Sequence, residues 1–276
     1  VETKVMQKKQ SGGILLGKQQ MMFPRTYGLV SSETRTLPKN TAALEALCQR
    51  YPGKVNVMLV PAASAVYPEN VPAGAPLLDE DRYLDALSEA VQAAGGRFVD
   101  VRQTLADHKD EYIYYRTDHH WTSLGAYYAY CAWRGIEPNA DEWTQEVLCD
   151  NFHGTTWNKV PLPSVPAEEI TAWYKHKNRR VSYNNGQYET DSIYERKYLS
   201  GSDQYAVFLN SNQAQTVIEG SGKSGKLLLI KDSYGNSMVP YLTYNYDEVV
   251  VLDLRAIPFN MSEFMAENEF DEILLL

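Results

Sequence analysis

Short and almost uninterrupted apolar runs, separated by helical patterns, constrain the fold of this chain more than any other feature. The runs are VNVMLV, RFVDV, LLLI, VVVL and ILLL, which begin at Val55, Arg97, Leu227, Val249 and Ile273. A strand that is buried on both faces shows no alternation of polar and apolar residues. Strands of this kind, alternating with helices, are typical of a parallel sheet covered on both sides. We therefore expect an α/β fold.

Three segments carry helical signals between these runs. In residues 78–96 apolar side chains recur every three or four positions, and the segment ends in Gly95-Gly96. Residues 122–135 begin with Thr122 or Ser123 as N-cap and stop at a glycine. Residues 238–246 place Pro240 in the first turn of a further helix.

The segment 136–223 differs in composition from the rest of the chain, because it is polar and rich in tyrosine. RRVSYNNGQYE alternates around Asn185-Gly186, which indicates a type I′ hairpin, and QYAVFLN (204–210) indicates another short strand. We expect a β-containing insertion at 136–223. Residues 1–135 and 224–276 would then be the two parts of a single α/β domain.

Composition narrows the classes of function. The net charge of −9 leaves no basic surface for nucleic acid. No apolar run reaches the length that spans a bilayer. Cys48, Cys131 and Cys149 are widely spaced, so they form neither a CxxC zinc pattern nor a disulfide framework. Because the chain begins at Val1 and not at a methionine, we expect that a leader or anchor has been removed.

The stretch KDSYGNS (231–237) could supply a nucleophile. It follows LLLI directly and precedes a helical segment, so Ser233 is expected on a strand-to-helix turn at the carboxyl end of a parallel strand. The N–H groups from Ser233 to Asn236 could then face a developing oxyanion. An alternative is that Asp232, Ser233 and Ser237 simply cap the helix.

The stretch DHHW (118–121) could supply a base. Asp118 and His120 lie two residues apart, so in an extended chain their side chains share one face, and His119 points the other way. The carboxylate could hold the imidazole in the tautomer that leaves its second nitrogen free for a serine hydroxyl. The N-terminus of the following helix disfavours a protonated imidazole there.

Two alternatives use the same residues. Asp118, His119 and His120, together with His108 or His153, could bind a metal as in a phosphoesterase, although adjacent histidines rarely reach one ion from an extended chain. The segment could also be an ordinary helix entrance.

Several stretches together resemble a known family. TDHHWTSLGAYYAY, FHGTTWNK, LLLIKDSYGNSMVPYL and VVVLDLR look like the DHHW proteins of Gram-positive bacteria. Those proteins are relatives of the SGNH-like acyltransferases that O-acetylate alginate. The resemblance extends over nearly the whole chain and implies an SGNH-hydrolase-like parallel sheet flanked by helices. It also implies a permuted order, in which Asp and His precede the serine.

Carried over residue by residue, the resemblance makes Ser233 the nucleophile, His120 the base and Asp118 its orienting partner. Tyr234, Gly235 and Asn236 would line the oxyanion site. The sequence has Lys-Asp-Ser where the usual motif is Gly-Asp-Ser, and it has no clear Gly-x-Asn-Asp block.

Arg255 follows VVVL and would reach the same sheet edge. It could supply positive charge to an oxyanion or to an acidic sugar, or it could pair with Asp253.

The expected function is a serine-dependent O-acyl, mainly acetyl, transferase or esterase that acts on a cell-surface polysaccharide without a metal or other cofactor. The resemblance also implies export and a membrane partner that donates the acyl group. The rival hypothesis is a non-catalytic carbohydrate-binding or scaffold protein with the same fold.

Overall fold

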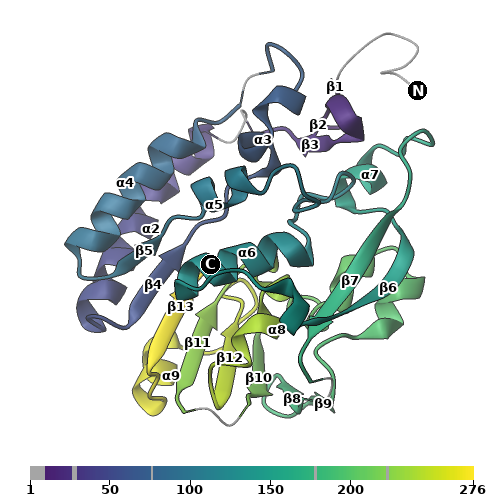
Figure 1. The fold of residues 1–276 in the computed structure, drawn as a ribbon. Coiled ribbons are helices and arrows are strands. Elements are labelled where there is room, and N and C mark those ends of the chain that lie inside the picture. The colour runs from purple at the N-terminus through teal and green to yellow at the C-terminus, as the bar shows by residue number, and fades with distance from the viewer. Residues whose placement is uncertain (1–9, 27–29, 76, 177–178, 222–223) are drawn as a thin grey trace.

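The computed structural model describes residues 10–26, 30–75, 77–176, 179–221 and 224–276. At its centre is an eight-stranded, mostly parallel sheet, as the apolar runs predict (Figure 1). Its strand order is β5-β4-β13-β11-β12-β10-β8-β9; the five strands from β5 to β12 are parallel, and β10, β8 and β9 join by antiparallel pairing. The bounds are β4 Val55–Met58, β5 Arg97–Val99, β8 Val181–Tyr183, β9 Tyr188–Thr190, β10 Gln215–Glu219, β11 Lys226–Ile230, β12 Glu248–Leu252 and β13 Glu272–Leu275.

Helices cover both faces of this sheet. One face packs against α2 (Val30–Arg50), α4 (Glu80–Ala93) and α9 (Met261–Glu267). The other face packs against α3 (Ala63–Val66), α5 (Arg102–Asp107), α6 (Ser123–Arg134) and α8 (Val239–Leu242). Strand β11 shows why its apolar run is unbroken: Leu228 faces the first set of helices and Leu229 the second.

The predicted helix signals are confirmed. Asp79 caps α4, where its side chain accepts a hydrogen bond from the N–H of Arg82. Thr122 caps α6 through the N–H of Gly125, and Gly135 ends that helix in the left-handed conformation, with φ of 63°. Pro240 lies in the first turn of α8.

Two smaller sheets accompany the main one. The first contains β1 (Gln10–Ser11), β2 (Ile14–Leu16) and β3 (Met22–Pro24), and the second pairs β6 (Thr144–Phe152) with β7 (Glu168–Tyr174). One short helix, α7 (Thr155–Lys159), follows β6. The 3₁₀ helices are η1 Lys18–Gln20, η2 Pro68–Asn70, η3 Ala140–Glu142, η4 Arg196–Ser200, η5 Gln204–Val207 and η6 Ser233–Ser237.

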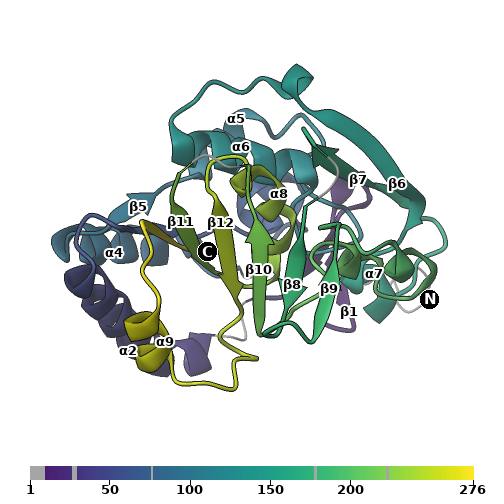
Figure 2. The ribbon, with the colours of Figure 1, turned by 90° about the horizontal axis from the view of Figure 1, so that it is seen from below.

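The segment 136–223 contributes to both the main sheet and a separate one. Figure 2 shows β10, β8 and β9 continuing the main sheet beside β12, whereas β6 and β7 form their own sheet. The division of the chain at 136 and 223 stays a prediction. The prediction of a strand at QYAVFLN was wrong. Gln204–Val207 forms η5, and Leu209, Asn210 and Ser211 have positive φ, which is incompatible with an extended strand.

The hairpin predicted at Asn185-Gly186 joins β8 to β9, but its turn is wider than a type I′ turn. Tyr183 pairs with Tyr188, so four residues form the loop. Asn184, Asn185 and Gly186 have φ of 49°, 57° and 83°. Asparagine tolerates this region better than other residues with a side chain, so the Asn-Asn-Gly run suits the wider loop.

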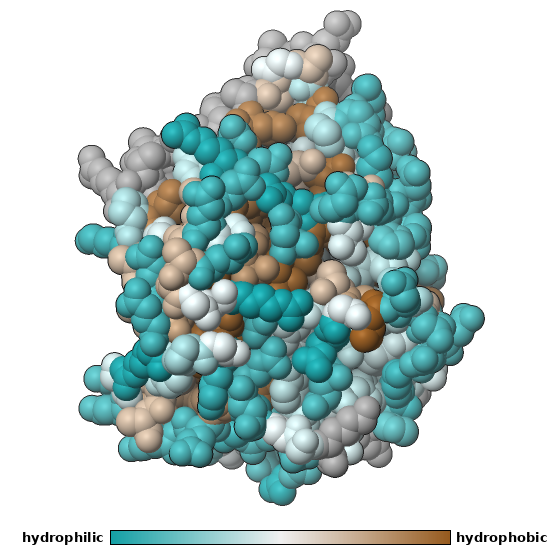
Figure 3. Space-filling view, turned by 60° about the vertical axis from the view of Figure 1, so that its left-hand side comes forward, coloured by the Kyte–Doolittle hydropathy of each residue, from teal (hydrophilic) through white to brown (hydrophobic). Residues whose placement is uncertain are grey.

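Figure 3 shows a face on which hydrophilic residues cover most of the surface, with hydrophobic ones visible between them. Among the described residues, no helix combines the length and the apolar character needed to cross a bilayer.

Candidate active site

Ser233 lies where the strand-to-helix pattern predicted it. Strand β11 ends at Ile230, and Ser233 opens η6 two residues after Lys231. The side chain of Asp232 accepts a hydrogen bond from the N–H of Tyr234 at 2.8 Å and thereby caps this short helix. The turn lifts Ser233 out of the sheet at the carboxyl edge of the parallel strands.

A second segment brings His120 to the same edge. The chain doubles back between Tyr114 and Trp121, which form an isolated antiparallel bridge, and the N–H of Tyr115 donates to the carbonyl oxygen of His120 at 3.2 Å. The indole N–H of Trp121 reaches the carbonyl oxygen of Tyr234 at 3.0 Å and Ser237 Oγ at 2.9 Å. Trp121 therefore fixes the DHHW segment against the turn that carries Ser233.

Three side chains form one hydrogen-bonded line. Ser233 Oγ lies 2.7 Å from His120 Nε2, and His120 Nδ1 lies 2.6 Å from Asp118 Oδ1. His120 and Asp118 are buried, with 3% and 1% of their surface exposed, whereas Ser233 is partly exposed. In this arrangement the imidazole can take a proton from the hydroxyl while the carboxylate holds its orientation.

The second oxygen of Asp118 has its own partners in α7. The N–H of Thr155 donates to Oδ2 at 2.6 Å, and the Thr155 hydroxyl donates to the same atom at 2.9 Å. Burial opposes ionisation of Asp118, but His120 and these hydrogen bonds outweigh it and hold the pKa of the carboxyl well below its ordinary value. Gly154 packs so closely that an added Cβ would stand 2.2 Å from Asp118 Cβ.

Tyr205 supports the imidazole from its face. The rings of Tyr205 and His120 are parallel within 2°, with centroids 3.9 Å apart. The Tyr205 hydroxyl donates to the carbonyl oxygen of Ser233 at 3.3 Å. Sequence reasoning missed both Tyr205 and Thr155 as parts of the site. FHGTTWNK was part of the family resemblance and includes Thr155, but no local pattern pointed to Tyr205.

The prediction that His119 faces away from the line was wrong. Residues 116–120 form a bend and not an extended strand, so His119 lies beside Asp118, with its Nδ1 3.5 Å from Asp118 Oδ1. Its Nδ1 lies 2.8 Å from Thr155 Oγ1, and its ring centroid lies 3.8 Å from that of His120. Burial and the neighbouring His120 lower the pKa of His119 to about 4.

Metal-ligating atoms of Asp118, His119 and His120 lie within 4.8 Å of one another, so this group could hold an ion. His108 and His153 do not belong to it: His108 stacks on Tyr128, and His153 lies over Trp157. An ion on His120 would compete with the hydrogen bonds to Ser233 and Asp118, so the geometry favours proton transfer over metal binding.

The oxyanion donors differ from those expected. The N–H of Tyr234 is bonded to the Asp232 side chain, and the N–H of Gly235 donates to the Asp232 carbonyl oxygen at 3.2 Å. Neither group is free, because Asp232 caps the turn. Within the described residues, the N–H of Ser233 itself has no acceptor, as is usual for the first N–H groups of a helix. It is therefore the remaining backbone donor of this turn.

Asn236 is buried, and its side-chain N–H₂ donates to Asn212 Oδ1 at 3.2 Å. Its Oδ1 has no partner among the described groups. Asn212 also accepts a hydrogen bond from Lys231 Nζ at 3.1 Å. The Lys231 side chain is only 1% exposed, and its burial, opposed by Asp253, lowers its pKa to about 8. Lys231, Asn212 and Asn236 thus form a hydrogen-bonded polar group whose Lys231 and Asn236 lie on either side of Ser233 in the chain.

Arg255 reaches this edge and pairs with Asp253. Its Nε lies 2.8 Å from Asp253 Oδ1, and a second nitrogen lies 2.5 Å from Oδ2. Of the two expectations for Arg255, the geometry shows the ion pair. Much of the guanidinium's charge is already balanced by this carboxylate.

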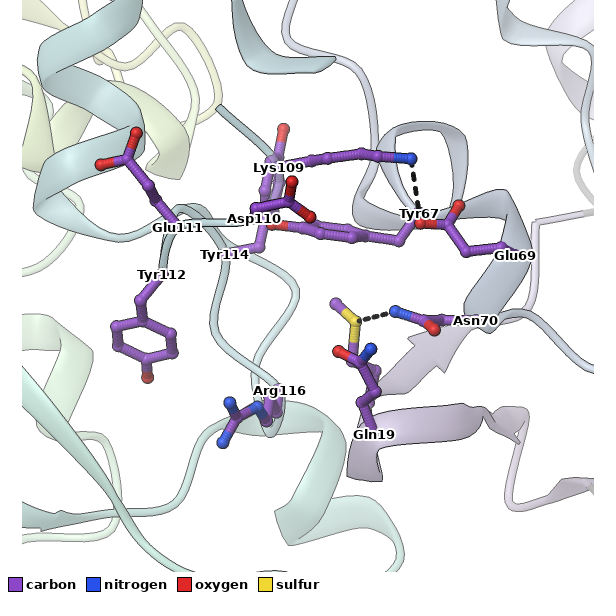
Figure 4. A pocket seen from close by; sticks show the side chains of 11 residues that line it. Gln19, Tyr67, Glu69, Asn70, Lys109, Asp110, Glu111, Tyr112, Tyr114 and Arg116 are labelled. Atoms are coloured by element: carbon purple, nitrogen blue, oxygen red, sulfur yellow. Dashed lines mark hydrogen bonds and ion pairs between the residues drawn. The ribbon is translucent and has the colours of Figure 1, made fainter. Parts of the chain in front are cut away.

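Figure 4 shows a separate cavity of about 290 Å³, whose lining includes Tyr112, Tyr114 and Arg116 from the segment that precedes DHHW in the chain. Side chains of both charges line it, and the ion pair between Lys109 and Glu69 spans one side at 3.1 Å. Arg116 and Tyr112 lie at the opposite side in the figure. The lining includes neither Ser233 nor His120.

Two protein-family models match the chain. The model of the DHHW protein family matches residues 88–252, and that of the SGNH hydrolase-like domain of the acetyltransferase AlgX matches residues 14–134. No curated protein has detectable sequence similarity to the chain.

Solved structures share the fold over nearly the whole chain. A DHHW family protein from Eubacterium siraeum has a TM-score of 0.77 at 24% identity, covering 96% of this chain and 90% of that one. PatB1 of Bacillus cereus has a TM-score of 0.73 at 15% identity, with coverage of 95% and 94%. The O-acetyltransferase domain of AlgJ from Pseudomonas putida has a TM-score of 0.58 at 14% identity, with coverage of 95% and 89%. The fold is therefore SGNH-hydrolase-like, as the resemblance implies.

Proposed function

The chain belongs to the DHHW protein family, whose model matches more than half of its length, and from this premise we propose that it is a serine-dependent O-acyl transferase or esterase. The acyl group is acetyl, and the substrate is a cell-surface polysaccharide. The hydrogen-bonded line of Ser233, His120 and Asp118 is the observation that carries this proposal. Similarity to the AlgX acetyltransferase model supports acyl transfer as the general chemistry.

In the proposed reaction His120 Nε2 takes the hydroxyl proton while Ser233 Oγ attacks the acyl carbonyl carbon. The carbonyl π bond breaks and its oxygen becomes the oxyanion, which the Ser233 N–H can stabilise. The tetrahedral intermediate collapses, the bond to the donor oxygen breaks, and the protonated imidazole returns the proton to that oxygen. A sugar hydroxyl then resolves the acyl-enzyme in a transferase, and water does so in an esterase.

Export to the cell surface and a membrane-bound partner that donates the acyl group belong to the same proposal. Both rest on the family resemblance alone, and no contact within this chain supports them. Co-purification of the full-length protein from membranes with an acyl-loaded partner would test them.

Hydrolysis of 4-nitrophenyl acetate by the purified protein tests the proposal. We expect Ser233→Ala and His120→Ala each to lower kcat/KM by about 10³-fold or more. Mass spectrometry after treatment with a fluorophosphonate should place the label on Ser233. If the parent protein shows neither turnover nor label, the enzyme proposal fails and a non-catalytic carbohydrate-binding protein becomes the better hypothesis.

A further inference from the structure

A cavity rich in carboxamide side chains opens at the same sheet edge as Ser233. It has a volume of about 400 Å³. Three loops form it: the β8–β9 turn, the segment that leads into β10, and the segment that leaves β12. A second cavity of about 330 Å³ shares Asn185, Gln215 and Phe259 with it and extends along α9. We call the first cavity the carboxamide groove.

Polar and apolar side chains line the groove, and none of them is charged. No acidic or basic side chain lines it, although charged residues make up 22% of the whole chain. Its carboxamides are Asn184, Asn185, Gln187, Asn212, Gln213 and Gln215. An amide both donates and accepts hydrogen bonds, as a sugar hydroxyl does. Phe259 adds an aromatic surface, and an aromatic ring can pack against the apolar face of a pyranose.

Some of these amides hold the loops in place. Asn184 Nδ2 donates to Gln213 Oε1 at 3.0 Å, and Asn184 Oδ1 accepts a hydrogen bond from the N–H of Gln215 at 3.2 Å. Other amides are free: within the described part of the chain, the side chains of Asn185, Gln187 and Gln215 have no hydrogen-bond partner. The loops are therefore fixed, and their free amides line the groove.

Asn212 connects the groove to the Ser233 turn. Its Oδ1 accepts hydrogen bonds from Lys231 and Asn236, which lie on either side of Ser233 in the chain. Because a lysine ammonium only donates, this contact fixes which end of the Asn212 amide faces the turn. The N–H₂ end is directed away from Lys231 and has no acceptor within the described residues.

We propose that the carboxamide groove binds a neutral glycan, built of hexose or N-acetylhexosamine units, and presents it to Ser233. The proposal rests on the proposed function for the claim that this glycan is the substrate. An uncharged lining offers no cation to a polyuronate, and the nearby Arg255 is already paired with Asp253. The groove therefore selects a neutral chain over an acidic one.

Calorimetric titration of the Ser233→Ala protein tests this without turnover. The probes are chitopentaose and cellopentaose, which are neutral, and an oligoguluronate of the same length, which is acidic. We expect at least one neutral probe to bind more tightly than the oligoguluronate. Replacing Gln187 and Gln215 together with alanine should weaken that binding about tenfold. Gln92→Ala, which changes an exposed amide on α4, should leave it unchanged.

The groove proposal is overturned if neither neutral probe binds at about 10 mM, if the double variant binds as tightly as its parent, or if the oligoguluronate binds best. Labelling of Ser233 by the fluorophosphonate is scored separately. A labelled protein that binds no neutral glycan refutes the groove and leaves the enzyme proposal standing. An unlabelled protein whose glycan binding depends on Gln187 and Gln215 refutes the enzyme proposal and supports the groove as a binding site.

Discussion

The ring of Tyr205 lies parallel to the imidazole of His120 at a centroid separation of 3.9 Å, although neither residue is near the other in the sequence. Asp118 fixes one edge of the imidazole, and the stacked phenol fixes its plane. Both contacts restrict the direction of His120 Nε2, the atom that faces the Ser233 hydroxyl. Tyr205 is thus a positioning residue for the proposed base.

Replacing Tyr205 separates stacking from hydrogen bonding. Tyr205→Leu removes the flat surface, and we expect kcat/KM for 4-nitrophenyl acetate to fall about 10–100-fold because the imidazole gains freedom. Tyr205→Phe keeps the ring and loses only the long hydrogen bonds of the hydroxyl, so its loss should be much smaller. Equal losses in the two variants would show that the hydroxyl, and not the ring, matters.

The contact between Gly154 and Asp118 gives a prediction for stability and activity. A Cβ at Gly154 would stand 2.2 Å from Asp118 Cβ, so Gly154→Ala must displace α7 or the carboxylate. We expect a loss of about 1–3 kcal/mol in the free energy of unfolding, together with reduced turnover.

Gly201→Ala is the matched control, because its Cβ would meet nothing closer than 3.4 Å and φ there is −99°. Urea unfolding and the acetyl ester assay measure both variants. Identical behaviour of the two would contradict the role assigned to Gly154.

Asp118→Asn tests the orienting role of the carboxylate. An amide can accept from Thr155 but can also present N–H₂ to His120 Nδ1, which favours the tautomer with its proton on Nε2. That tautomer cannot accept the Ser233 proton, so we expect kcat to fall about 10³–10⁴-fold. Asp107→Asn, an exposed change on α5, serves as control in the same assay. Activity close to that of the parent would remove Asp118 from the proposed mechanism.

Local patterns predicted most of what positions the site. The unbroken apolar run of β11 indicates a strand that is buried on both faces. Thr122 and Gly135 mark the two ends of α6. The predicted roles of Ser233, His120 and Asp118 rest on these elements and on the family resemblance.

Contacts between distant segments could not be predicted in the same way. Tyr205 lies in η5 and Asn212 in a loop. The positions of both depend on how the segment 136–223 packs, which no short-range periodicity encodes. The prediction that the N–H groups of Tyr234 and Gly235 are free to stabilise an oxyanion was wrong for a different reason. Asp232 accepts hydrogen bonds from both groups as a cap, a role that the sequence offered only as an alternative to an oxyanion site.

His119 should make the folded state sensitive to mild acid. Its pKa in the folded protein is lowered to about 4, against an ordinary value of about 6.5. Between these two values the unfolded chain binds the proton and the folded protein does not. The free energy of unfolding therefore falls as the pH drops through this window. The carboxyl of Asp118 adds its own loss only at lower pH, since its pKa in the unfolded chain is about 3.9.

His119→Gln removes the titrating group while leaving a side chain that can bond to the Thr155 hydroxyl. We expect its urea midpoint to change less than that of the parent between pH 7 and about pH 4.5. His176→Gln, a change at an exposed histidine, should follow the parent curve. If His119→Gln and the parent lose stability equally over this range, His119 is not the group that couples acid to unfolding.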